Sequence, residues 1–138
     1  MMIEKLNKLE AAFTHALKAA LHNIDSEKID KILDNRDYST FSDAWMEAYK
    51  AVDGKEIDED TEDAITLFRK EIFISIFKTT GSSELPAYIS DDFGLISSYY
   101  IHDIENSWVT HLLFTYLNHQ IPQGELMKTD KAMKDLIS

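Results

Sequence analysis

Apolar residues recur three or four positions apart through most of this chain, and few glycines or prolines interrupt them. This spacing places the apolar side chains on one face of an amphipathic helix, as it does over residues 3–23. The apolar positions of that segment are Ile3, Leu6, Leu9, Phe13, Leu17 and Leu21. The four glycines and two prolines fall where breaks between helices are expected, rather than turns between strands. The pattern predicts an all-α fold.

Caps and breaks divide the remainder of the chain into further helices. We expect Ser26 and Ser90 to cap helices, because a serine side chain can accept a hydrogen bond from the first turn, and Gly54 and Gly81 to end them. After the first helix, the predicted helices cover about residues 26–33, 39–52, 59–80, 90–105, 107–118 and 125–137. The helix at 59–80 is the most apolar, so we expect it at the centre of the core. A chain of this length suits one domain, and we predict a single compact domain of six to seven helices spanning residues 1–138.

Negative charge is concentrated in one part of the chain. Residues 25–63 carry 14 of the 25 carboxylates but only five of the 14 lysines and arginines, which accounts for −9 of the net charge of −11. Seven of these acids lie between Asp53 and Asp63. Such an imbalance accelerates encounter with a positively charged partner. The acids that begin the helix at 59–80 also have a structural reason, since the helix dipole favours negative charge there.

The composition excludes several classes of protein. Without cysteine the chain has no disulfide, thiolate nucleophile or cysteine-bound zinc. No apolar run approaches the roughly 18 to 20 residues of a membrane-spanning helix, and the first residues lack the basic and apolar regions of a signal peptide. We therefore expect a cytoplasmic protein without a membrane partner. Nucleic acid is also an unfavourable partner, because the surface would repel phosphates and only two arginines are present.

Known catalytic and calcium motifs are absent from the sequence. There is no Gly-x-Ser-x-Gly turn, no phosphate-binding glycine loop and no HExxH pair. A calcium loop starting at Asp53 would place Asp58 at the glycine position and Ala64 at the position of the bidentate glutamate. We predict no catalytic residues, no metal site and no cofactor.

Two histidine pairs leave one alternative open. His15 and His22 lie seven residues apart on one predicted helix, and His111 and His119 lie eight apart on another. Each pair can share a helix face, as paired metal ligands do. A metal-dependent helical enzyme is therefore a third hypothesis, behind two kinds of binding protein.

Aromatic side chains near the acidic stretch are candidate anchors for a protein partner. Tyrosine and tryptophan are common at the centre of tight interfaces, inside a polar rim. Tyr99 and Tyr100 are adjacent, so we expect at least one of them near the surface, while Trp108 and Tyr116 have the spacing of core residues. The predicted partner-binding residues are Asp34, Asp37, Tyr38, Asp43, Trp45, Glu47, Asp53, Glu56, Asp58, Glu59, Asp60, Glu62, Asp63 and Tyr99.

The segment SDDFGLI at residues 90–96, the pattern Trp108-x3-Leu112-x3-Tyr116 and the pair Ile121-Pro122 are similar to a core pattern of small helical immunity proteins. In its size, acidity and lack of cysteine, the chain also resembles these proteins, with which bacteria neutralise a toxin domain delivered by a neighbouring cell, as in contact-dependent growth inhibition. The resemblance implies a toxin domain as partner, often a basic nuclease. Its active-site cleft would be occluded by carboxylates that stand in for phosphates.

The leading hypothesis is thus an inhibitory protein that binds a cognate, basic toxin domain through its acidic surface. The alternative is a non-catalytic helical adaptor or regulatory module, in which the acids serve solubility and helix capping. The two differ in a measurable way, because only the first requires an association rate that falls with salt. The sequence leaves the oligomeric state open.

Overall fold

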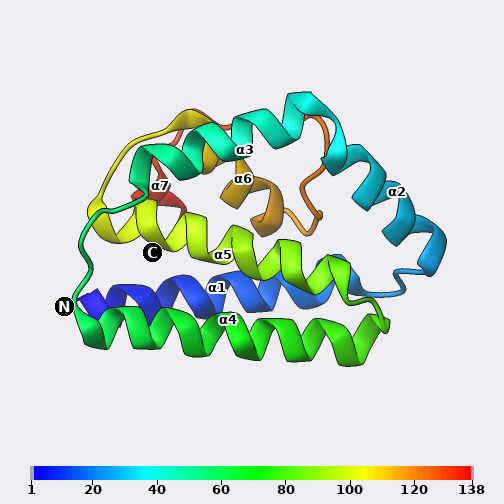
Figure 1. Ribbon diagram of the computed structural model, residues 1–138, viewed down its shortest axis with the longest axis horizontal. Helices are drawn as coiled ribbons and strands as arrows, with labels where there is room; N and C mark the ends of the chain where they lie inside the picture. The colour runs from blue at the N-terminus through cyan, green and yellow to red at the C-terminus, as the bar shows by residue number, and fades with distance from the viewer. Residues whose placement is uncertain (1, 138) are drawn as a thin grey trace.

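The computed structural model describes residues 2–137, which form seven α-helices and contain no strand. The helices are α1 (Met2–Leu21), α2 (Ser26–Asp37), α3 (Ser39–Val52), α4 (Glu59–Thr80), α5 (Glu84–His102), α6 (Ser107–Leu117) and α7 (Met133–Leu136). They pack as one compact arrangement (Figure 1). The prediction of an all-α fold with six to seven helices is confirmed.

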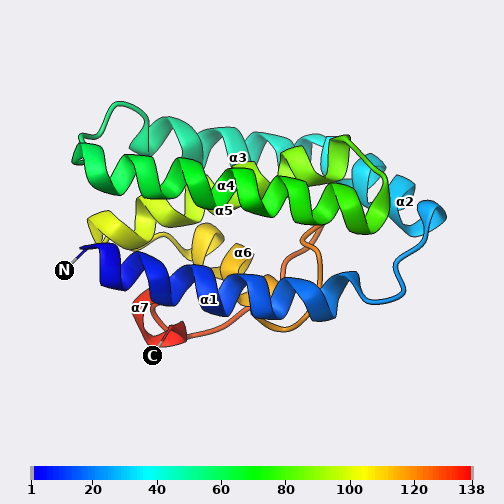
Figure 2. The same ribbon diagram turned by 90° about the horizontal axis from the view of Figure 1, so that it is seen from below.

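Helix α5 is the centre of this arrangement. It lies between α3 and α4 (Figure 1), and α1 and α6 cover it from another side (Figure 2). Twelve of its 19 residues are buried, whereas α4 buries only Thr61, Ile65, Ile72 and Ile76. The prediction that residues 59–80 form the central helix is therefore wrong. The prediction was based on the high apolar content of α4, but α4 carries apolar residues on its outer face as well as on its inner one.

Helix α2 begins and ends at different residues than predicted. Asp25 caps it, since its Oδ1 accepts a hydrogen bond from the Lys28 backbone N–H at 2.8 Å, and Ser26 is already helical. The helix continues to Asp37, four residues beyond the predicted end at Leu33. The extension places the side chain of Arg36 inside the core, where it is buried and hydrogen-bonded.

Helix α5 begins at Glu84, six residues before the predicted cap Ser90. Pro86 does not prevent this, because it lies in the first turn, where a backbone N–H has no partner within the helix. Gly94 lies inside the helix, and the Arg69 side chain packs against it; a Cβ there would lie 3.3 Å from Arg69 Cδ. The predicted break after this helix is confirmed, with Asp103 in the left-handed region (φ 53°).

The segment after α6 is mostly irregular, so the helix predicted at 125–137 is wrong except for the four residues of α7. Buried Leu126, Met133 and Ile137 hold it against the rest of the protein. Its last part, which contains α7, lies on the opposite side of the molecule from α3 and α4 (Figure 2), whereas Pro122 near its start accepts a hydrogen bond from Arg36 of α2. Within residues 2–137 no ion pair joins the lysines of this segment to the acids of residues 25–63.

A buried carboxylate joins four helices. Asp92 of α5 is fully buried and accepts hydrogen bonds from Arg36 of α2 (2.7 and 2.9 Å), Trp45 Nε1 of α3 (2.9 Å) and the Tyr116 hydroxyl of α6 (2.5 Å). Arg36 also donates to the backbone oxygen of Pro122 at 3.1 Å. Four donors match the lone pairs that two carboxylate oxygens offer. The charge of Asp92 is thus satisfied inside the core.

The same contacts fix the protonation of the neighbouring groups. Burial disfavours the charge of Arg36, but Asp92 outweighs it and raises the pKa of the guanidinium. Burial and the nearby charge of Asp92 both raise the pKa of Tyr116 well above its ordinary value. Tyr116 therefore remains a hydrogen-bond donor.

Replacing Asp92 with alanine will strongly destabilise the protein. The Asp92→Ala variant leaves Arg36 buried without its counterion, a change that costs about 3–5 kcal/mol in the free energy of unfolding. The matched control is Asp91→Ala, which removes a solvent-accessible pair with Arg69 and is expected to cost less than about 1 kcal/mol. Urea denaturation followed by circular dichroism measures both, and equal losses would contradict this account.

Alkaline pH will destabilise the protein in part through Tyr116. Above about pH 10 the unfolded chain loses its tyrosine protons while buried Tyr116 keeps its own, so stability falls as the pH rises. In Tyr116→Phe this contribution is absent, and we expect a shallower fall between about pH 9 and 11. Other tyrosines with raised pKa, such as Tyr99 and Tyr100, leave a residual slope. If stability fell equally steeply with pH in the two proteins, Tyr116 would have the same pKa in the folded and unfolded states, which would contradict this account.

Candidate functional site

Two adjoining hollows lie beside α3. The first, of about 220 Å³, is formed by α2, α3 and α5, and the second, of about 280 Å³, by α3, the loop after it, α4 and α5. Trp45 and Asp91 line both hollows. We call the two together the α3–α5 groove. The charged residues that line it are Arg36, Asp37, Asp53, Lys55, Glu62, Arg69, Asp91 and Asp92.

Trp45 stands where the two hollows meet, and its position is fixed from two sides. Its Nε1 donates to buried Asp92 at 2.9 Å, and the Tyr49 ring stacks on it at a centroid distance of 5.6 Å and an angle of 15°. Tyr49 and Met46 are exposed beside it, and Tyr38 at the start of α3 is 67 % exposed. The groove therefore contains a rigid aromatic centre with little rotamer freedom.

The free charge of the groove is negative. Arg36 is bonded to Asp92, and Arg69 Nη2 lies 2.5 Å from Asp91 Oδ1. Among residues 2–137 these are the two ion pairs within 4.0 Å, so both arginines are neutralised by the groove itself. The remaining lining charges are those of Asp37, Asp53, Glu62 and Lys55.

Burial raises the pKa of Asp91, while the Arg69 guanidinium opposes that rise. The two neighbours Asp91 and Asp92 thus have different environments, one at the surface of the groove and one beneath it. Arg69 Nε also donates to the backbone oxygen of Ser90 at 3.1 Å. This contact ties α4 to α5 at the wall of the groove.

Part of the acidic stretch stabilises helix α4. Asp58 caps the helix, because its oxygens accept from the Thr61 backbone N–H at 3.1 Å and the Thr61 hydroxyl at 2.7 Å. These bonds lower the pKa of Asp58. Glu59, Asp60 and Glu62 lie in the first turn, where the helix dipole favours carboxylates.

The predicted acidic residues are all exposed, but they form two groups. The list of exposed acids is Asp34, Asp37, Asp43, Glu47, Asp53, Glu56, Asp58, Glu59, Asp60, Glu62 and Asp63. In the first group Asp34 and Asp37 precede α3 while Asp43 and Glu47 lie on it, and the stretch 53–63 lies beyond its end (Figure 1). At 1.5 Å per residue, α3 separates the residues that flank it, Asp37 and Asp53, by about 20 Å. The groove connects them, since Asp37 lines its first hollow and Asp53 its second.

Tyr99 was predicted as an exposed anchor, and that prediction is wrong. Its side chain is 1 % exposed and its hydroxyl donates to the Ala48 backbone oxygen at 2.8 Å. Tyr100 is buried as well, with Lys5 of α1 lying 5.0 Å from its ring centroid. Both neighbours are covered because α5 is packed on opposite faces. Tyr49 of α3, by contrast, is exposed.

The groove includes residues that sequence reasoning missed. Met46, Tyr88 and Asp91 line it, although only the acidity of Asp91 stood out in the sequence. Tyr88 precedes Ser90, the predicted start of helix α5. Its position one turn before Asp91 and Asp92 would have been a signal once α5 is known to begin at Glu84.

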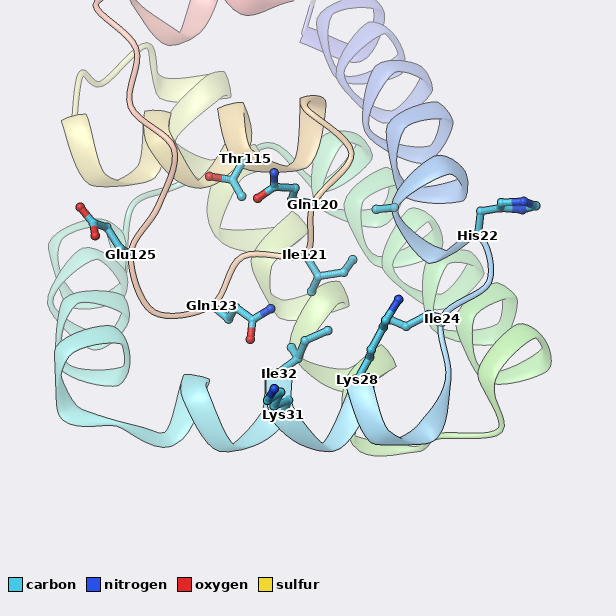
Figure 3. Close-up of a pocket in the computed structure, with 11 residues that line it drawn as sticks. His22, Ile24, Lys28, Lys31, Ile32, Thr115, Gln120, Ile121, Gln123 and Glu125 are labelled. Atoms are coloured by element: carbon cyan, nitrogen blue, oxygen red, sulfur yellow. The ribbon is translucent and has the colours of Figure 1, made fainter.

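Another pocket, of about 340 Å³, lies between α2, the turn before it and the segment after α6 (Figure 3). Lys28 and Glu125 lie far apart on it, and His22 points away from it (Figure 3). The Asn35 amide donates to Gln123 Oε1 at 2.8 Å, which holds the segment after α6 against α2. Gln123, which lines this pocket, thus has a structural role.

The histidine pairs do not assemble a metal centre. Helix α6 ends at Leu117 and His119 has a left-handed backbone (φ 64°), so His111 and His119 do not share a helix face. His111 Nε2 lies 3.2 Å from the Thr129 backbone oxygen. Within residues 2–137 no three histidine or carboxylate side chains are grouped as metal ligands.

No helix in that range has the length and apolarity required to span a bilayer.

Comparison with known proteins supplies the family. The model of the family "Immunity protein PIM1" matches residues 7–123, a range that runs from α1 to the segment after α6 and contains the whole groove. No curated protein matches the chain. The resemblance to immunity proteins is confirmed, although the comparison does not specify the delivery system of the toxin. The chain belongs to the PIM1 family of immunity proteins, whose function is to neutralise a toxin.

Proposed function

We propose that the protein neutralises its toxin by holding a basic toxin domain, such as a nuclease, in the α3–α5 groove. One observation carries this proposal: two hollows joined at a rigid tryptophan, with carboxylates at both ends. Interfaces that bind tightly combine such an aromatic centre with a polar rim. The groove is the place on the described surface where both features occur together.

The charge distribution favours a cationic partner. Asp37, Asp53 and Glu62 face solvent along the groove, and Asp43 and Glu47 extend the negative surface along α3. Opposite charges on a partner raise the rate of encounter and exclude partners of the same sign. A nuclease cleft is positively charged because it binds phosphates, and groove carboxylates would occupy the same positions on it.

The mode of action requires no chemistry from this protein. Occupation of the cleft is sufficient for inhibition, so we propose a non-catalytic binding protein that acts without a cofactor in the cytoplasm, where an incoming toxin meets its target. Delivery by a neighbouring cell, as in contact-dependent growth inhibition, suits this arrangement. The adaptor hypothesis is disfavoured by the groove, because acids that served capping alone would not need to line a hollow.

The first experiment is rescue of growth. A sensitive host expresses the toxin domain encoded beside this gene, with or without the protein, and the two proteins are then co-purified. We expect rescue and a stable complex. If the toxin domain kills the host although this protein is present and folded, the two are not a cognate pair.

Reversing the groove charges will slow association with the toxin. In Asp37→Lys/Asp53→Lys/Glu62→Lys we expect an association rate at least about tenfold lower at low salt, because the steering field is lost. The matched control reverses three exposed acids outside the groove: Glu125→Lys/Asp130→Lys/Asp135→Lys. Both variants change the net charge equally. Stopped-flow measurement at several salt concentrations compares them, and an equal effect in both would place the interface elsewhere.

Truncating Tyr49 will speed dissociation of the complex. Removal of an aromatic anchor at an interface centre costs about 2 kcal/mol or more, and in Tyr49→Ala we expect this loss mainly in the dissociation rate. Phe77→Ala is the control, because Phe77 has a similar exposure (47 %, against 41 % for Tyr49) but lies on α4 away from the groove. Surface plasmon resonance measures both. If Phe77→Ala had the larger effect, the groove would not be the interface.

A further inference from the structure

Helix α4 exposes apolar side chains on the face that points away from the core. Leu67, Ile74 and Phe77 are 53 %, 41 % and 47 % exposed, and Phe73 stacks on Phe77 at 6.5 Å. At 100° per residue, Leu67 and Ile74 lie about half a turn around the helix from the buried residues. Single exposed apolar residues are common, but a cluster on one helix marks an interaction surface.

Within residues 2–137 no other helix covers this face. Helix α4 forms the lower edge of the molecule in Figure 1 and is nearest to the viewer in Figure 2. Its packing partners are α5 and α1. The groove lies against a different face of α4, which contributes Thr66 and Arg69 to it. The outer face is therefore free when the groove is occupied.

The charges on the outer face are balanced and symmetric along the helix. Asp63 lies one turn before Leu67, and Lys78 lies one turn after Ile74. Lys70 and Glu71 stand midway between the two apolar residues. All four charged side chains are exposed. In a chain of net charge −11, this strip has no net charge, so it does not match the cationic partner proposed for the groove.

We propose that this face binds a second copy of the chain, with the two α4 helices antiparallel and crossing at Lys70 and Glu71. In that register Leu67 faces the second copy's Ile74, Asp63 faces its Lys78, and Lys70 faces its Glu71. Two-fold symmetry repeats every one of these contacts. A parallel pair would instead place Asp63 against Asp63 and Lys78 against Lys78, which is repulsive.

The overall negative charge does not prevent this pairing. At physiological ionic strength charges are screened over about 8 Å, so the acids of the groove act weakly across a dimer, whereas the contacts along α4 are within that range. The resulting dimer carries two open grooves. It would thus bind two toxin domains, one in each copy.

Sedimentation equilibrium at about 0.15 M salt tests the proposal with the full-length protein. We expect a reversible monomer–dimer equilibrium at concentrations up to about 1 mM, the range of weak association. Ile74→Ala weakens it, because each dimer loses two apolar contacts. A protein that stays monomeric at about 1 mM would overturn the proposal.

A charge exchange tests the register. Asp63→Lys and Lys78→Asp, taken singly, each replace two attractive pairs by two repulsive ones and should weaken the dimer about tenfold. The double variant Asp63→Lys/Lys78→Asp restores the attraction and should return the dimer to within a few-fold of its original strength. Recovery cannot arise from better folding, because both exchanged charges oppose the helix dipole.

Two results would contradict the arrangement of the second copy. Single variants that dimerise normally, or a double variant that does not recover, exclude the antiparallel register. Variants of α4 that remain monomeric but lose toxin binding would show that the toxin occupies this face. The toxin-binding experiments on Asp37, Asp53 and Glu62 are independent of either result.

Discussion

The buried carboxylate of Asp92 is the interaction on which the rest of the structure depends. It receives donors from α2, α3 and α6 while standing on the central helix α5. A buried charge is costly unless its lone pairs are satisfied, and burying the ion pair adds little stability by itself. Its effect is on specificity: a shift of any of these helices would leave a charge or a donor without its partner. The hydrogen bonds to Asp92 therefore fix how α2 and α3 lie on α5, and this placement creates the groove.

The same interaction fixes the walls of the groove. Trp45 is oriented by its bond to Asp92, and the Arg36 guanidinium lies over the rings of Phe41 (4.5 Å) and Tyr88 (5.3 Å). The walls of the first hollow are thus set before a partner arrives, which lowers the entropy lost on binding. Because Asp92 cancels the charge of Arg36, the net charge of the groove is determined by the exposed acids around it. The structural ion pair thus lies below the exposed carboxylates and leaves their charge unchanged.

Local patterns in the sequence predicted the helices, and global packing explains what they missed. The 3.6-residue period fixes α1, α3, α4 and α6, since each has to bury one face. It does not report which helix is central. Pro86 and Ser90 indicated a later start for α5, but a proline is harmless in a first turn. The exposure of Tyr99 depends on coverage of α5 from both sides, and the position of Asp92 depends on contacts up to 56 residues away. Neither is encoded in nearby residues.

The acidic stretch also shows why composition indicates a partner's charge better than its binding site. Asp58 caps α4, and the acids next to it lie in the first turn of that helix. The number of acids in this stretch therefore does not by itself locate an interface. Asp37 and Asp53 are about 20 Å apart along α3 and belong to the same surface only because a groove connects them. Long-range steering depends on the summed charge, whereas tight binding depends on the few side chains that a partner covers. The first property can be read from the sequence, and the second exists only once α3 is packed on α5.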